Sequence, residues 1–196
     1  MNKIIIFSIL ALLIFVYGCA SPEDAAFKKG VKRINQIDEQ FGATMKTPPD
    51  SEENVDGLII QLTGFGAANE NMPKALNYLL DFRIKSLEAE KLHIEGWQWG
   101  KGSTTDYGFG CRKGTARILN SSKIRNSSAY KGYEALNSLQ LLIDESPDKA
   151  KSLNLTQKDI LFLNAAYQQV EDRAARDSRT IRNICKEQIK EFNITI

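Results

Sequence analysis

Apolar residues recur at three- and four-residue steps along most of the chain, the spacing that places them on one face of an α-helix. In the first such segment the repeat runs from Phe27 to Phe41. Ser21 and Pro22, just before it, suit a helix N-cap and the first helical position. The pattern therefore predicts a helix over residues 22–41.

The same repeat predicts further helices over residues 50–62, 73–95, 111–124, 127–147 and 156–192. Gly57 disfavours the second of these, so a buried strand over residues 58–62 is the alternative there. The chain has no Asn-Gly hairpin and no alternating run of β-branched residues. We therefore predict an all-α fold, a five- to six-helix bundle with a long C-terminal helix.

The N-terminus has a different pattern. Lys3 precedes a run over residues 4–16 that is apolar except for one serine, and Gly18-Cys19 follows. A positive residue, a short apolar stretch and a small residue before the cut are typical of a secretory signal peptide. With Cys19 directly after Gly18, the segment resembles the signal of prokaryotic lipoproteins, in which this cysteine is lipidated. Tyr17 departs from that pattern, since a small residue is usual there.

The resemblance implies a signal peptide over residues 1–18 and a single extracytoplasmic domain over residues 19–196. Lipid on Cys19 would then attach the domain to the outer face of the cell membrane. The alternatives are an uncleaved anchor, although a membrane-spanning helix needs about 20 apolar residues, and plain secretion. All three place the domain outside the cytoplasm.

Charge and cysteine content narrow the class of partner. The whole chain carries 26 basic and 24 acidic residues, and its near-neutral balance predicts no nucleic-acid partner. Beyond Cys19 the chain has two cysteines, Cys111 and Cys185. In an exported chain such a pair predicts a disulfide, and two separate buried thiols are the alternative.

Residues 96–110 are rich in glycine and carry four aromatic side chains, Trp97, Trp99, Tyr107 and Phe109. Two interpretations remain open for this predicted loop. The rings either pin a long loop onto the core, or form a shallow surface on which a sugar or a protein partner stacks.

No catalytic motif is present. Glu90 and His93 have the Glu-x-x-His spacing of di-iron bundles, but those sites need a second histidine and His93 is the only one in the chain. No nucleophile-elbow pattern occurs either. We therefore predict a protein that is not an enzyme and has no metal and no cofactor.

The first predicted helix carries four clustered basic residues, Lys28, Lys29, Lys32 and Arg33. Close to a membrane such a cluster attracts anionic lipid. The alternative is a solvated helix face whose charge is balanced by Glu23, Asp24, Asp38 and Glu39.

Four Asn-x-Ser/Thr sequons are candidate glycosylation sites, at Asn120, Asn126, Asn154 and Asn193. All four fall at ends of predicted helices or in predicted loops.

These observations favour a membrane-anchored extracytoplasmic lipoprotein whose non-catalytic helical domain binds an unknown partner protein or a surface component. The alternative is a ligand-binding or transporter-accessory protein that uses the aromatic, glycine-rich segment over residues 96–110 as its site.

Overall fold

The computed structural model describes residues 21–69, 71–101 and 111–186, and these form six helices. They are α2 (Pro22–Gln40), α3 (Glu52–Ala67), α4 (Lys74–Lys101), α5 (Cys111–Glu145), α6 (Pro147–Ser152) and α7 (Gln157–Ile184). The predicted all-α bundle is confirmed, and the alternative of a strand over residues 58–62 is wrong because those residues lie inside α3.

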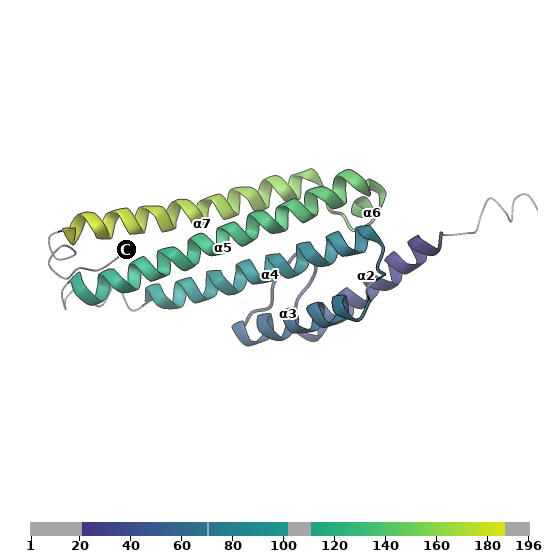
Figure 1. Ribbon diagram of the computed structural model, residues 1–196, viewed down its shortest axis with the longest axis horizontal. Helices are drawn as coiled ribbons and strands as arrows, with labels where there is room; N and C mark the ends of the chain where they lie inside the picture. The colour runs from purple at the N-terminus through teal and green to yellow at the C-terminus, as the bar shows by residue number, and fades with distance from the viewer. Residues whose placement is uncertain (1–20, 70, 102–110, 187–196) are drawn as a thin grey trace, which may run out of the picture.

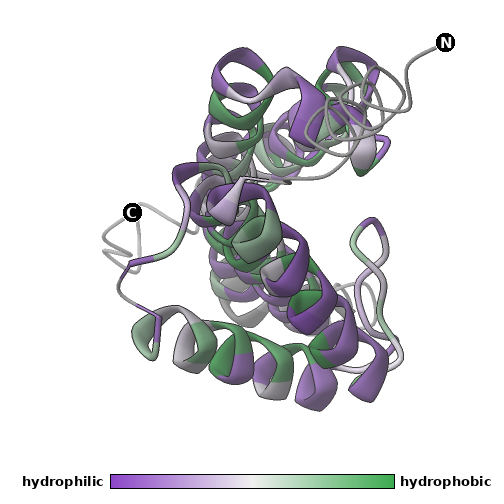
Figure 2. Cartoon of the chain, turned by 90° about the vertical axis from the view of Figure 1, so that its right-hand side faces the viewer, coloured by the Kyte–Doolittle hydropathy of each residue, from purple (hydrophilic) through white to green (hydrophobic). Residues whose placement is uncertain are grey.

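Three long helices, α4, α5 and α7, run side by side, with α5 in contact with both of the others (Figure 1). Helices α2 and α3 pack against α4, and α6 is a short turn of helix between α5 and α7. Hydrophobic and hydrophilic stretches alternate along the helices (Figure 2), as expected where each helix buries one stripe. No helix in the described part of the chain has an apolar stretch long enough to cross a bilayer.

The main core lies where α2 and α3 meet α4 and the C-terminal half of α5. Its fully buried aliphatic side chains include Ile34, Ile37, Val55, Leu58, Leu62, Leu79, Leu87, Leu139 and Leu142. A second, smaller cluster joins Ile118 of α5 to Ile181 and Cys185 at the end of α7. The packing is therefore concentrated at one end of the long helices.

Local capping chemistry explains where several helices begin. The Ser21 hydroxyl accepts a hydrogen bond from the backbone N–H of Asp24 at 3.0 Å, as predicted. At α3 the cap is Ser51, one residue after the predicted start of that helix, and its hydroxyl accepts from the Asn54 N–H at 3.2 Å. At α7, Asp159 accepts from the Thr156 N–H at 2.8 Å, which confirms the predicted start.

Several predicted helix boundaries are wrong. Helix α3 ends at Ala67 instead of residue 62, and α7 ends at Ile184 instead of residue 192. Helix α4 continues past the predicted end at residue 95 to Lys101, and α5 has no break near residues 124–127. Two serines of α5 donate hydrogen bonds to carbonyl oxygens of α4. Ser121 Oγ lies 2.7 Å from Gly96 O, and Ser128 Oγ lies 2.7 Å from Ala89 O.

These two bonds define an antiparallel pairing, because a step of seven residues forward on α5 matches seven backward on α4. Small residues make the pairing tight: a Cβ atom added at Gly96 would lie 2.6 Å from Arg125 Cγ. Gly96 therefore sits inside a helix because the neighbouring helix leaves no room for a side chain.

The continuous α5 also changes the setting of two sequons. Asn120 and Asn126 lie in the middle of α5, so the expectation that they fall at helix ends or in loops is wrong for them. Asn154 lies in the exposed turn between α6 and α7, with a φ of 53°, as expected. Asn193 lies outside the described residues.

The predicted disulfide falls partly outside the described side chains. Cys185 is buried at the end of α7, whereas only the backbone of Cys111 is described, at the start of α5. Because α5 and α7 are antiparallel, these two helix ends lie at the same end of the molecule (Figure 1). The Cys111–Cys185 bond stays a prediction.

A buried ion pair joins α2 to α4. Asp38 and Arg83 are only 1% and 3% exposed, and Asp38 Oδ1 accepts from Arg83 Nε at 2.9 Å and from a terminal guanidinium nitrogen at 2.7 Å. The same guanidinium donates to the carbonyl of Thr47 at 3.3 Å. Arg83 therefore fixes both α2 and the connection between α2 and α3.

We predict that Arg83→Met lowers the free energy of unfolding by about 3–5 kcal/mol, because it leaves the Asp38 carboxylate buried without its counter-charge. The double variant Asp38→Leu/Arg83→Met should regain most of that loss, since it removes both charges. Urea unfolding of the three proteins measures both values. A double variant as unstable as the single one would contradict this account.

Candidate functional site

A cleft lies between α4 and α7. Its volume is about 390 Å³, and Ser128 of α5 and the connection between α2 and α3 also contribute to it. Ligand sites for small molecules typically measure about 300–1,000 Å³. A larger hollow of about 710 Å³ beside α5 is lined mostly by polar side chains, so the α4–α7 cleft is the better candidate for an apolar ligand.

Most of the cleft wall is apolar. The apolar lining comprises Met45, Pro48, Phe82, Leu87, Ala89, Leu155, Phe162, Leu163, Ala166 and Val170, and Tyr167 adds an aromatic ring. Phe162 is 74% exposed even though it lines the cleft, so it extends from the wall toward solvent. A wall of this composition with few polar groups is typical of small-molecule sites.

The cleft exists because α7 buries little of its predicted apolar stripe. Of the described residues of α7, only Ala174 and Ile181 are buried. Leu163, Tyr167 and Val170 belong to the same stripe, but they are half-buried and line the cleft. The stripe is therefore core in its C-terminal half and cleft wall in its N-terminal half.

Close packing on α5 orients the Tyr167 ring. A Cβ atom added at Gly132 would lie 2.4 Å from that ring, so only glycine leaves room for it. Tyr133 meets Tyr167 edge to face, with ring centroids 6.2 Å apart, and its hydroxyl lies 2.9 Å from a Glu171 carboxylate oxygen. Burial, with help from Glu171, raises the pKa of Tyr133 to about 12.

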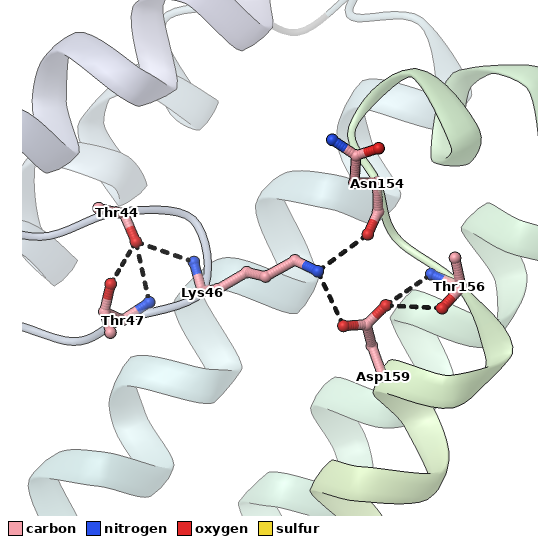
Figure 3. Close-up of polar contacts among 6 residues, drawn as sticks. All are labelled: Thr44, Lys46, Thr47, Asn154, Thr156 and Asp159. Atoms are coloured by element: carbon pink, nitrogen blue, oxygen red, sulfur yellow. Dashed lines mark hydrogen bonds and ion pairs between the residues drawn. The ribbon is translucent and has the colours of Figure 1, made fainter.

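Lys46, at one end of the cleft, contacts Asn154 and Asp159 (Figure 3). Its Nζ donates to Asn154 O at 2.9 Å and to Asp159 Oδ1 at 2.8 Å. Thr156 holds the other oxygen of Asp159, and a hydroxyl–hydroxyl contact between Thr44 and Thr47 tightens the turn that carries Lys46. The ion pair connects the α2–α3 connection directly to the start of α7.

Partial burial raises the pKa of Asp159, but the hydrogen bonds from Lys46 and Thr156 outweigh it, so the net pKa is lower than its ordinary 3.8. Asp159 is therefore ionised at neutral pH. Because the Lys46 and Asp159 side chains are 50% and 26% exposed, their pair fixes geometry more than it adds stability.

His93 brings the most distinctive polar group to the cleft. Its Nε2 accepts a hydrogen bond from Trp97 Nε1 at 2.9 Å. Since the indole nitrogen only donates, the ring proton of neutral His93 must be on Nδ1. Nδ1 is buried and has no hydrogen-bond partner among the described residues, so it remains a donor without an acceptor.

The surroundings keep this imidazole neutral. Burial lowers the pKa of His93 below 6.5; the carboxylate of Glu90 opposes that shift, and the positive charges of Arg125 and Arg173 add to it. Arg125 also lies over the Trp97 ring, 5.9 Å from its centroid, and pairs with Asp177 at 2.6 Å. His93, which Glu90-x-x-His93 suggested as a weak metal motif, is instead a neutral hydrogen-bond donor in a cleft wall.

The described residues of the predicted aromatic loop do not line this cleft. Trp97 and Trp99 lie on the last turns of α4, 46% and 42% exposed, so the expectation that they belong to a loop is wrong. Trp97 still contributes, because it holds the tautomer of His93. Tyr107 and Phe109 lie outside the described residues, as does Cys19.

The sequence pattern missed several cleft residues. Met45 and Lys46 stand in a stretch that predicts only a break between helices, and Ser128 resembles a helix cap. No pattern in the chain signals that these three residues line one cleft, since Ser128 lies 82 residues after Lys46 in the sequence. Within the described residues, no group of three or more His, Cys, Asp or Glu side chains is placed to hold a metal ion.

Comparison with protein-family models, with curated proteins and with solved structures finds no match to this chain.

We predict that the single imidazole titrates below pH 6.5, because the charged form is disfavoured by burial. Above pH 6.5 the ring is neutral in both the folded and the unfolded state, so its titration does not affect stability. The free energy of unfolding falls as the pH drops from 6.5 toward the folded-state pKa, because the unfolded state takes up the proton first. NMR of the histidine ring protons measures the pKa directly.

Trp97→Phe provides the control. It removes the N–H that favours the neutral ring, so the pKa of His93 should rise toward 6.5. An unchanged pKa in this variant would show that the Trp97–His93 bond does not stabilise the neutral ring.

Proposed function

We propose that this chain is a membrane-anchored, extracytoplasmic binding protein that holds a small, largely apolar ligand in the cleft between α4 and α7. The observation that supports the ligand site is the half-buried part of the α7 stripe: Leu163, Tyr167 and Val170 line a cavity of about 390 Å³ instead of being fully covered. Uncovered apolar surface of this kind costs free energy unless something binds there.

His93 indicates one polar feature of the ligand. Its Nδ1–H lacks a hydrogen-bond partner among the described residues, and a buried donor left unpaired costs about 1–3 kcal/mol. Because His93 lines the cleft, a ligand whose carbonyl, ether or hydroxyl oxygen reaches Nδ1 would remove that cost. We therefore propose an apolar molecule with one hydrogen-bond acceptor, bound without covalent chemistry.

A second candidate is an apolar segment of a partner protein. Leu161 and Phe162 are neighbours on α7, 63% and 74% exposed, and only Phe162 lines the cleft. Of these two residues, a small ligand in the cleft would contact only Phe162, whereas a protein segment that extends beyond the cleft would also cover Leu161. Leu161→Ala therefore distinguishes the two, since it should weaken only the binding of a protein segment.

We predict that the protein binds the apolar fluorescent dye N-phenyl-1-naphthylamine saturably, and that Ala166→Trp weakens this binding by about tenfold or more, which is at least ~1.4 kcal/mol. Ala166 is exposed and lines the cleft, so the indole would fill the space. Fluorescence titration gives both dissociation constants.

Ala165→Trp is the matched control. Ala165 is the preceding residue on α7 and is equally exposed, but it does not line the cleft. Both variants should melt like the parent protein. Dye binding that survives Ala166→Trp, or that both variants lose equally, would show that the cleft is not the site.

The anchorage rests on the resemblance of residues 1–19 to a lipoprotein signal. We predict that Cys19→Ser moves the protein from the membrane fraction to the soluble fraction, because the lipid has no other attachment point in the resembling segment. Fractionation with immunoblotting measures this, and intact mass reports the added lipid. A variant that stays in the membrane with residues 1–18 retained would favour the uncleaved anchor.

A further inference from the structure

Helix α2 has two opposite faces. At about 100° per residue, Lys28, Lys29, Lys32 and Arg33 fall within an arc of about 140°. The buried residues Phe27, Gly30, Ile34, Ile37 and Asp38 fall on the other side of the helix. All four cations are exposed, and we call them the α2 basic face.

The carboxylates nearest in sequence do not neutralise this face. Glu23 and Asp24 both lie within ion-pair distance of Lys149 on α6, at 2.7 and 3.5 Å. Asp38 is buried against Arg83 at 2.7 Å. Of the four acidic residues of α2, only Glu39 is left near the basic face.

Within the part of the chain that the structure describes, none of the four cations of the α2 basic face forms an ion pair. Other lysines of the described residues do so: Lys46, Lys74, Lys85, Lys91, Lys131 and Lys149. The α2 basic face is therefore a concentrated positive charge that the fold itself leaves uncompensated.

A hollow beside this face combines charge with apolar surface. Its volume is about 690 Å³, and Lys29, Lys32 and Arg33 border it together with Phe65, Met72 and Leu76 from α3, α4 and their connection. A phosphate next to hydrocarbon, as in a lipid headgroup region, matches that combination of side chains.

The position of α2 in the chain adds a geometric constraint. The helix begins at Pro22, three residues after Cys19. Three extended residues span at most about 11 Å, which is close to the Debye length of about 8 Å at physiological ionic strength. If residues 1–19 attach the chain to a membrane, by either route, α2 cannot move far from the lipid surface.

We propose that the α2 basic face lies on the anionic lipid headgroups of the membrane to which the chain is anchored, and so sets the orientation of the domain. The proposal rests on the proposed anchorage. It adds to the ligand-binding function, since the cleft is formed by other helices and uses none of these four residues.

The test uses the protein purified from membranes with its own anchor, placed in two kinds of vesicle, phosphatidylcholine alone and phosphatidylcholine mixed with phosphatidylglycerol. A short pulse of a lysine-acetylating reagent, followed by peptide mass spectrometry, reports the reactivity of each lysine. We expect Lys28, Lys29 and Lys32 to react severalfold more slowly in the anionic vesicles than in the neutral ones. Lys123, exposed on α5, should react equally in both.

Salt should remove the protection, because the Debye length falls from about 10 Å at about 0.1 M to about 3 Å at about 1 M.

Lys28→Gln/Arg33→Gln leaves Lys29 and Lys32 as reporters and should largely abolish their protection, since each charge contributes about a fivefold factor at an anionic surface. Arg173→Gln/Arg176→Gln removes two exposed cations from α7 and should change nothing.

Equal reactivity of the three lysines in both vesicles, or protection that persists at high salt, would overturn the proposal. Flotation of the vesicles separates the two possible failures. Protein that floats but shows no protection contradicts the basic-face proposal alone, whereas protein that floats with neither vesicle contradicts the anchorage and the basic-face proposal together.

Discussion

The arrangement of the cleft depends on the buried pair between Asp38 and Arg83. Replacing such a pair by apolar residues is often neutral, because desolvation of the two charges offsets their attraction. Its role here is geometric. One guanidinium holds α2 through Asp38 and the α2–α3 connection through the carbonyl of Thr47, and the same side chain lines the cleft. Lys46, one residue before Thr47, then reaches α7 through Asp159.

These contacts link α2, the α2–α3 connection, α4 and α7. The seam between α4 and α5 is tight because Ser121 and Ser128 donate to α4 carbonyls and Gly96 permits close approach. Helix α7 packs on a neighbouring face of α5, where Gly132 leaves room for the Tyr167 ring. Helices α4 and α7 are each held by α5, so the space between them is left as a cleft, and the Lys46–Asp159 ion pair joins the α2–α3 connection to α7 at one end of it.

The surroundings of each polar group decide its charge state and its partners. In the cleft wall, burial keeps His93 neutral and Trp97 fixes which nitrogen carries its proton. On α2, the carboxylates that would neutralise the basic residues are drawn to Lys149 and Arg83. The same ion pair that organises the cleft therefore also removes one negative charge from reach of the α2 basic face.

The sequence by itself determined the features that depend only on residues close to one another in the sequence. The starts of α2 and α7 were predictable because Ser21 and the Thr156–Asp159 pair cap backbone N–H groups within one turn. The helical class followed from the apolar repeat. The sequence also offered one alternative that the structure does not bear out: that carboxylates on α2 itself balance the basic residues of that helix.

Only the tertiary structure decided the features that need a partner helix. A serine can cap a helix or donate across a seam, and Ser128 does the second because Ala89 O lies 2.7 Å away. Leu163 and Ile181 occupy the same stripe of α7, yet one lines a cleft and the other is buried, because α5 and its neighbours cover only part of that stripe. Glu23 lies 5 residues from Lys28 in the sequence but pairs with Lys149, 126 residues away, because α6 folds back onto α2.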